Sequence, residues 1–98
     1  MADELEWLQG WFQRQCNGDW EHGHTISISG LDNPGWALDI ETADTGLDRA
    51  PFNKICNERS DLDWVHAQIE GTHFRAFGGP RDLTEMIRIF REWAERSA

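Results

Sequence analysis

Two stretches of the chain carry apolar side chains at every third or fourth position, which is the spacing of an amphipathic α-helix. The first covers residues 4–16, with Asp3 at the N-cap position and Asn17-Gly18 as the stop. The second follows Gly78-Gly79-Pro80 and begins after Asp82, its predicted N-cap. The apolar stripe of this second helix is the most regular in the sequence and consists of Leu83, Met86, Ile87, Phe90, Trp93 and Ala94.

Between the two helices the period changes to two, which is typical of half-buried strands. Residues 24–30 and 36–41 alternate in this way, and the turn residues 31–35 between them predict a hairpin. Residues 62–70 and 72–77 predict a second hairpin with its turn at Glu70-Gly71. This turn would place Trp64 opposite Phe77 on one face, and Ala67 opposite Phe74 on the other.

The predicted fold is α+β: a four-stranded antiparallel sheet of two hairpins, with the N- and C-terminal helices packed on one face. The other face of the sheet should stay in contact with solvent. Residues 42–61 show no regular pattern and are predicted to form a long connection. Because a loop of this length is unusual, it is either functional or contains an element that the pattern does not reveal. With 98 residues, the chain is expected to form one domain over 1–98.

Charge narrows the range of partners. Eighteen acidic residues oppose nine basic ones, for a formal net charge of -9. Such a surface repels the phosphates of nucleic acids and of anionic membranes, so neither is expected as a partner. Residues 1–31 contribute -4, residues 32–74 contribute -6 and residues 75–98 contribute +1. Six acidic residues on or beside the second and third predicted strands suggest a docking face for a basic protein, although solubility alone also accounts for them: Asp39, Glu41, Asp44, Asp48, Asp61 and Asp63.

Trp64 is a second candidate for partner binding. The other tryptophans on predicted elements lie on or beside apolar stripes, where core packing accounts for them. Trp64 falls on the solvated face beside Phe77, and an exposed aromatic pair is typical of an interface anchor. A shifted strand register would instead bury Trp64, and residues 42–61 could also cover it, so the sequence leaves its exposure open.

Catalytic chemistry has one candidate region. Asp19, Glu21, His22 and His24 offer oxygen and nitrogen ligands to a divalent metal, which leaves a small metal-dependent enzyme as an alternative. The simpler interpretation is a loop that caps the first helix, with Trp20 in the core and Asp19 bonded to local backbone amides. No nucleophile elbow or phosphate-binding loop occurs in the sequence. We therefore predict no catalytic residue, no bound metal and no cofactor.

The two cysteines and the N-terminus bear on the compartment. Cys16 and Cys56 form no CxxC pair and are predicted to be free, apolar and buried. The N-terminal residues are acidic and carry no signal-peptide pattern, so a cytoplasmic protein is expected.

Two short motifs are the most specific features of the chain: Gly18-Asp19-Trp20-Glu21-His22 and Leu31-Asp32-Asn33-Pro34-Gly35-Trp36. Together with Trp7-Leu8, Trp11, Asp63-Trp64, Phe90 and Trp93, they resemble the immunity protein 53 family of bacterial polymorphic toxin systems. The resemblance extends over nearly the whole chain. It implies a small cytoplasmic antitoxin that binds a cognate toxin and blocks it without catalysis.

The resemblance suggests how the acidic residues would be used. Many toxins of these systems are nucleases, whose clefts are basic because they hold phosphates. The hypothesis is that Asp39, Glu41, Asp44, Asp48 and Trp64 bind such a cleft, over an interface of roughly 800 Å² per partner. A general protein-interaction adaptor is the remaining alternative, for which Trp64 would matter and the charge would not. The sequence does not assign an oligomeric state.

Overall fold

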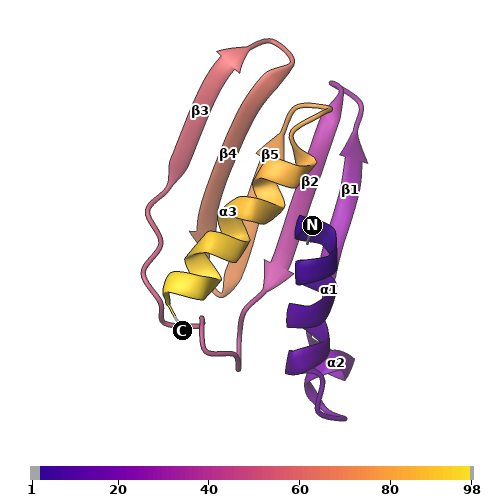
Figure 1. The fold of residues 1–98 in the computed structure, drawn as a ribbon, viewed down its shortest axis with the longest axis vertical. Helices are drawn as coiled ribbons and strands as arrows, with labels where there is room; N and C mark the ends of the chain where they lie inside the picture. The colour runs from indigo at the N-terminus through magenta and orange to yellow at the C-terminus, as the bar shows by residue number, and fades with distance from the viewer. Residues whose placement is uncertain (1–2, 98) are drawn as a thin grey trace.

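The computed structural model describes residues 3–97, which form a sheet with helices on one face (Figure 1). The elements in chain order are α1 (Glu4–Gln15), α2 (Trp20–Gly23), β1 (Ile26–Leu31), β2 (Gly35–Glu41), β3 (Ile55–Ser60), β4 (Asp63–Glu70), β5 (His73–Gly78) and α3 (Leu83–Arg96). All strand pairs are antiparallel, in the order β1-β2-β5-β4-β3. As predicted, the N- and C-terminal helices pack together on one face. None of the helices in the described residues is both long and apolar enough to cross a membrane.

The sheet has five strands, so the prediction of four is wrong. The additional strand, β3, lies inside the stretch 42–61 that was predicted to be a connection. It is an edge strand that pairs only with β4, and it lies beyond the edge of α3 in Figure 1. Ile55 is half-buried and the five residues after it are exposed. Because no helix covers β3, the strand needs no alternation of apolar and polar residues, and its period was therefore invisible in the sequence.

The β4–β5 hairpin has the predicted faces but a different register. Its two-residue turn begins at Gly71, whose φ of 63° suits the first central residue of a type II′ turn. Phe77 therefore pairs with His66 instead of Trp64. On its other side, Trp64 pairs with Glu58 of β3. The shift is two residues, an even number, so each side chain stays on its predicted face of the sheet.

The core lies between the sheet and the two long helices, and aromatic rings dominate it. Phe90 of α3 is fully buried and meets the rings of Trp7, Trp11, Phe74 and Trp93 edge-on, at centroid distances of 5.0 to 5.9 Å. Edge-to-face contacts at this distance add to the stabilisation from buried area. Phe90 thus joins α1, α3 and β5 in one packing unit.

The two helix starts differ. Asp3 caps α1 as predicted, since its Oδ1 accepts a hydrogen bond from the backbone N–H of Glu6 at 2.6 Å. Asp82 occupies the N-cap position of α3, but its side chain makes no capping bond, which corrects the prediction. Its Oδ2 instead accepts a hydrogen bond from the backbone N–H of Trp64 at 3.0 Å. Asp82 thereby connects the start of α3 to the start of β4.

Gly79 completes this junction. Its backbone N–H donates to the carbonyl of Trp64 at 3.0 Å, and a Cβ at this position would collide with the carbonyl oxygen of Leu62. Glycine is required here because two backbones approach closely. The backbone of Trp64 is consequently held at both its N–H and its carbonyl, which fixes the place from which its side chain projects.

Candidate functional site

The sheet face opposite the helices is the candidate site, and no other described element covers it. The buried side chains of β2, β4 and β5 point toward the helices, so the alternate residues of the same strands point away from them. We call this surface the open face. Its residues on β2, β5 and β4 are Ala37, Asp39, Glu41, His73, Arg75, Phe77, Trp64, His66, Gln68 and Glu70, with Cys56 and Glu58 on the edge strand β3.

A network of charged groups spans the middle of the open face. Asp39 lies 2.7 Å from His73 Nδ1 and 3.2 Å from Arg75 Nε, and Glu41 lies 3.2 Å from His73 Nε2. Arg75 also pairs with Glu70 at 3.3 Å, so the network links β2, β5 and β4. The hydrogen bond to Asp39, together with the negative charges of Asp39 and Glu41, raises the pKa of His73 above its ordinary value. Such half-exposed pairs add little stability, but they hold these side chains in a defined arrangement.

The open face is more acidic than the helix side. It carries four carboxylates (Asp39, Glu41, Glu58 and Glu70) against one guanidinium (Arg75), for a net charge of -3 with neutral histidines. Protonation of His73 reduces this to -2. The two long helices carry five carboxylates and four arginines, for a net charge of -1. The open face is therefore more acidic than the two long helices.

Aromatic side chains lie beside these charges. Trp64 is half-buried, and its ring meets the ring of His66 edge-on at a centroid distance of 5.4 Å. Phe77 is the cross-strand partner of His66, and the guanidinium of Arg75 lies 6.0 Å from the Phe77 ring centre. Of the six tryptophans, all of which are described, Trp64 alone lies outside the core cluster. Aromatic residues are enriched at the centre of protein interfaces, and polar and charged residues surround them at the rim.

The structure brings three of the five predicted binding residues onto one face. Asp39, Glu41 and Trp64 all belong to the open face, although Trp64 lies four residues along β4, roughly 13 Å, from the row that contains Asp39. Asp44 and Asp48 lie in the connection after β2. Asp44 is 80% exposed and forms an ion pair with His24 at 3.3 Å.

Sequence reasoning missed Cys56, Glu58 and Glu70 as residues of this face. The first two belong to β3, which was not recognised as a strand. Cys56 is exposed, so the prediction that both cysteines are buried is wrong for it; Cys16 is half-buried, and both are free. The one signal in the sequence was that Cys56 and Glu58 stand two positions apart, as they would on one face of a strand.

The loop over residues 17–24 is organised around its own backbone. Asn17 Oδ1 accepts hydrogen bonds from the N–H groups of Asp19 and Trp20, and the Glu21 carboxylate accepts from those of Asn17 and Gly18. Hydrogen bonds from the backbone of Glu21 itself, of Asn17 and of Gly18 lower the pKa of Glu21. The side chains that accept hydrogen bonds from local backbone amides are therefore those of Asn17 and Glu21, whereas the prediction named Asp19.

Trp20 anchors this loop in the core, as predicted. It is 4% exposed, and its indole N–H donates to the carbonyl of Ala43 at 2.9 Å. His24 stacks on it at 5.0 Å. Within the described residues, three potential metal ligands converge at two places, and neither includes a residue of this loop. The loop therefore holds the end of α1 against Ala43 and Asp44, which follow β2. Its four candidate ligands do not form a common site.

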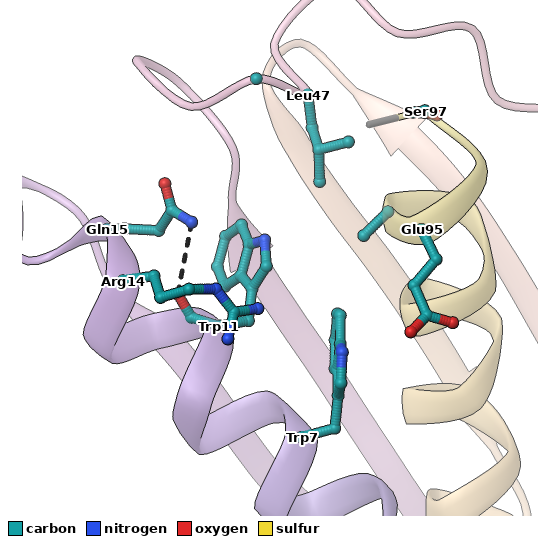
Figure 2. A pocket seen from close by; sticks show the side chains of 9 residues that line it. Trp7, Trp11, Arg14, Gln15, Leu47, Glu95 and Ser97 are labelled. Atoms are coloured by element: carbon teal, nitrogen blue, oxygen red, sulfur yellow. Dashed lines mark hydrogen bonds between the residues drawn. The ribbon is translucent and has the colours of Figure 1, made fainter.

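A hollow of about 330 Å³ lies on the helix side, where α1, α3 and the connection after β2 meet (Figure 2). Trp7, Trp11 and Leu47 form its apolar wall, and Arg14 and Glu95 stand at its rim. Gln15 turns back to its own helix, where its side-chain amide donates to the carbonyl of Trp11 at 3.3 Å. The hollow is mainly a gap above the aromatic core, on the opposite side of the molecule from the open face.

The architecture and the charged, uncovered sheet face define a small α+β binding domain. The family model described as Immunity protein 53 matches residues 5–95, and the chain belongs to this family. Neither curated proteins nor solved structures gave a match. Membership makes the chain an immunity protein of a toxin system, with a cognate toxin as its partner, and members of this family are not enzymes. The metal-dependent enzyme considered from residues 19–24 is thereby excluded.

Proposed function

We propose that this immunity protein neutralises its toxin by covering a functional surface of the toxin with the open face. The observation that carries the proposal is the position of Trp64, a half-buried aromatic held by its backbone at the margin of a face of net charge -3. Aromatic anchors supply most of the energy of protein interfaces, and charges of one sign select a partner of the other sign. The open face combines both.

The charge of the open face favours a basic partner. A nuclease domain is such a partner, because its cleft must attract and hold phosphates. Asp39 and Glu41 would face the basic groups of this cleft, with Asp44 and Asp48 extending the negative surface beyond the end of β2. An acidic protein seated there keeps the substrate out by occupying its place, which requires no chemistry from the immunity protein.

Charge reversal on the open face tests this proposal. The triple variant Asp39→Lys, Glu41→Lys, Asp44→Lys should associate with the toxin domain at least about tenfold more slowly at low salt, because electrostatic steering is reversed. The measurement is stopped-flow association at several salt concentrations, since screening reduces the difference. Cells that express the toxin domain should also lose protection when they carry this variant.

A matched control separates local complementarity from total charge. The variant Glu6→Lys, Glu92→Lys, Glu95→Lys changes the net charge by the same amount but places the lysines on exposed positions of α1 and α3. It should associate within about threefold of the natural chain and still protect cells. Equal slowing by both variants would mean that only total charge matters, and no slowing by either would remove the open face from the encounter.

A further inference from the structure

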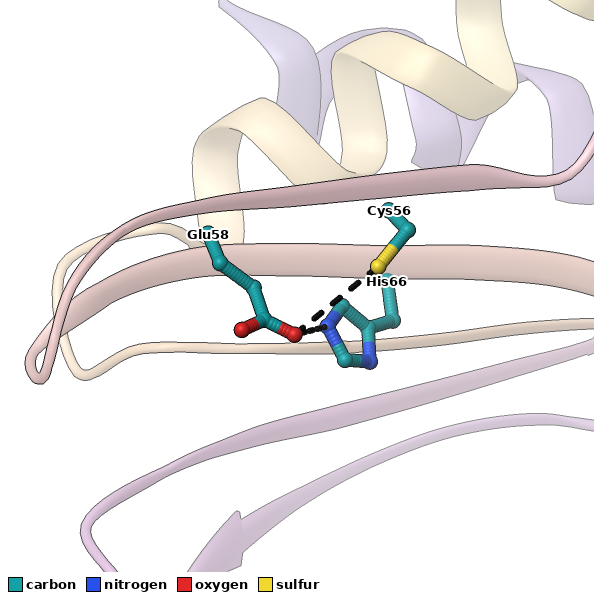
Figure 3. A group of neighbouring side chains, drawn as sticks. All are labelled: Cys56, Glu58 and His66. Atoms are coloured by element: carbon teal, nitrogen blue, oxygen red, sulfur yellow. Dashed lines mark hydrogen bonds and ion pairs between the residues drawn. The ribbon is translucent and has the colours of Figure 1, made fainter.

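Three side chains with different ligating atoms meet at the β3 edge of the open face (Figure 3). Cys56 and Glu58 are alternate residues of β3 and point to the same side, while His66 of β4 is the direct cross-strand partner of Cys56. Glu58 Oε1 lies 3.1 Å from His66 Nε2 and 3.8 Å from Cys56 Sγ. All three ligating atoms lie within 4.8 Å of one another.

We propose that Cys56, Glu58 and His66 form a binding site for a zinc-like transition metal ion. A tetrahedral zinc ion holds its ligands at about 2.3 Å for sulfur and about 2.1 Å for nitrogen and oxygen, which places N and O about 3.4 Å apart and S and O about 3.6 Å apart. The observed N–O and S–O separations, 3.1 and 3.8 Å, lie within about 0.3 Å of these values. The strand pair therefore already presents two edges of the coordination tetrahedron.

The donor set selects the class of metal. A thiolate and an imidazole are the ligands of zinc and related ions, whereas magnesium and calcium prefer oxygen alone. Three protein ligands leave the fourth position of a tetrahedral ion for a water molecule or another donor. When the ion binds, the Cys56 thiol releases its proton to solvent, because the thiolate is the ligand.

The surroundings of His66 suit this role. The Trp64 ring packs edge-on against the imidazole, and Phe77 flanks it from β5. These rings restrict the orientation of the imidazole and reduce its contact with water, as the apolar shell of a metal site does. Glu58 is 67% exposed, so its side chain can rotate to close the small remaining gap without backbone movement.

The other group of three potential ligands in the described residues is different. Asp63, Asp82 and Glu85 surround the guanidinium of Arg59, which pairs with Asp63 at 2.8 Å and with Glu85 at 2.7 Å. Asp82 additionally accepts the hydrogen bond from the backbone N–H of Trp64. An arginine already compensates this charge, whereas no arginine or lysine of the described residues pairs with Glu58.

Cobalt titration tests the proposal on the full chain, reduced and without a polyhistidine tag. One equivalent of Co²⁺ should produce the visible absorption of a tetrahedral ion and a thiolate-to-cobalt charge-transfer band. Zn²⁺ should remove both signals, and a large excess of Mg²⁺ should not. Cys56→Ser should abolish the charge-transfer band and weaken binding by more than the roughly 100-fold that loss of an outer-shell partner costs.

Cys16 supplies the matched control. It is the other cysteine of the chain, and its Sγ donates to the carbonyl of Phe12 in α1, away from the open face. Cys16→Ser should leave the cobalt spectrum and affinity unchanged, while His66→Gln should weaken binding as strongly as Cys56→Ser. An unchanged melting temperature without metal shows that each variant is folded. The proposal is overturned if cobalt does not bind at one equivalent, if the band survives Cys56→Ser, or if Cys16→Ser removes it. The test needs no toxin and is therefore independent of the proposed function.

Discussion

Replacing Trp64 with alanine is expected to weaken toxin binding by about 2 kcal/mol or more, which is about a 30-fold increase in Kd. Trp64 is the one tryptophan that the core does not use, and the hydrogen bonds from Gly79 and to Asp82 hold its backbone in place. A pre-positioned indole loses little conformational freedom on binding, so most of its burial contributes to affinity. Isothermal titration of the toxin domain with the variant measures the loss.

Leu5 offers the control for this substitution. It is an exposed apolar residue of α1, with 51% of its surface accessible, and lies on the helix side of the molecule. Leu5→Ala should change Kd by less than about threefold, because most residues outside the centre of an interface contribute little. If Leu5→Ala weakens binding and Trp64→Ala does not, the toxin binds the helices and not the open face.

Truncation of Phe90 should have the largest effect on folding. Phe90→Ala is expected to lower the free energy of unfolding by about 3–5 kcal/mol, because it leaves a cavity among four aromatic rings from two helices and one strand. The whole domain is expected to be stable by only about 5–15 kcal/mol, so the variant should lose a large share of its stability. Urea unfolding followed by tryptophan fluorescence measures the difference.

The comparison for Phe90 lies two residues further along α3. Glu92 is exposed, and Glu92→Ala should change the free energy of unfolding by less than about 0.5 kcal/mol. A loss of less than about 1 kcal/mol for Phe90→Ala would show that the aromatic cluster repacks easily and is not the centre of the fold.

Most of the elements with an apolar face could be predicted from the sequence, whereas β3, which packs only Ile55 against the core, was missed. The stripes of α1 and α3 and the alternation in β2, β4 and β5 arise from contact with the core, so burial leaves its period in the sequence. In β1 only Ile26 packs against the core, and Ile28 is exposed. β3 has no such contact after Ile55. The register of the β4–β5 hairpin was also missed, because glycine was placed second in the turn whereas Gly71 is first.

Strand alternation also predicted part of the candidate site. Asp39, Glu41 and Trp64 were assigned to the uncovered face from strand alternation alone, and the structure places them there. Asp44 and Asp48 were grouped with them because they are near in sequence, but the chain leaves the sheet after Glu41. Glu58 and Cys56 join the face only through pairing of β3 with β4, a long-range contact that local pattern does not encode.

The central claim is that the toxin binds the open face, and the six tryptophans provide a direct test. Trp7, Trp11, Trp20, Trp36 and Trp93 lie in or against the core, whereas Trp64 faces the open side of the sheet. In a ¹⁵N-labelled chain, one equivalent of unlabelled toxin domain should strongly shift the indole N–H signal of Trp64 and leave those of Trp7 and Trp11 close to their original positions. Large shifts for Trp7 and Trp11 with an unmoved Trp64 signal would contradict the claim.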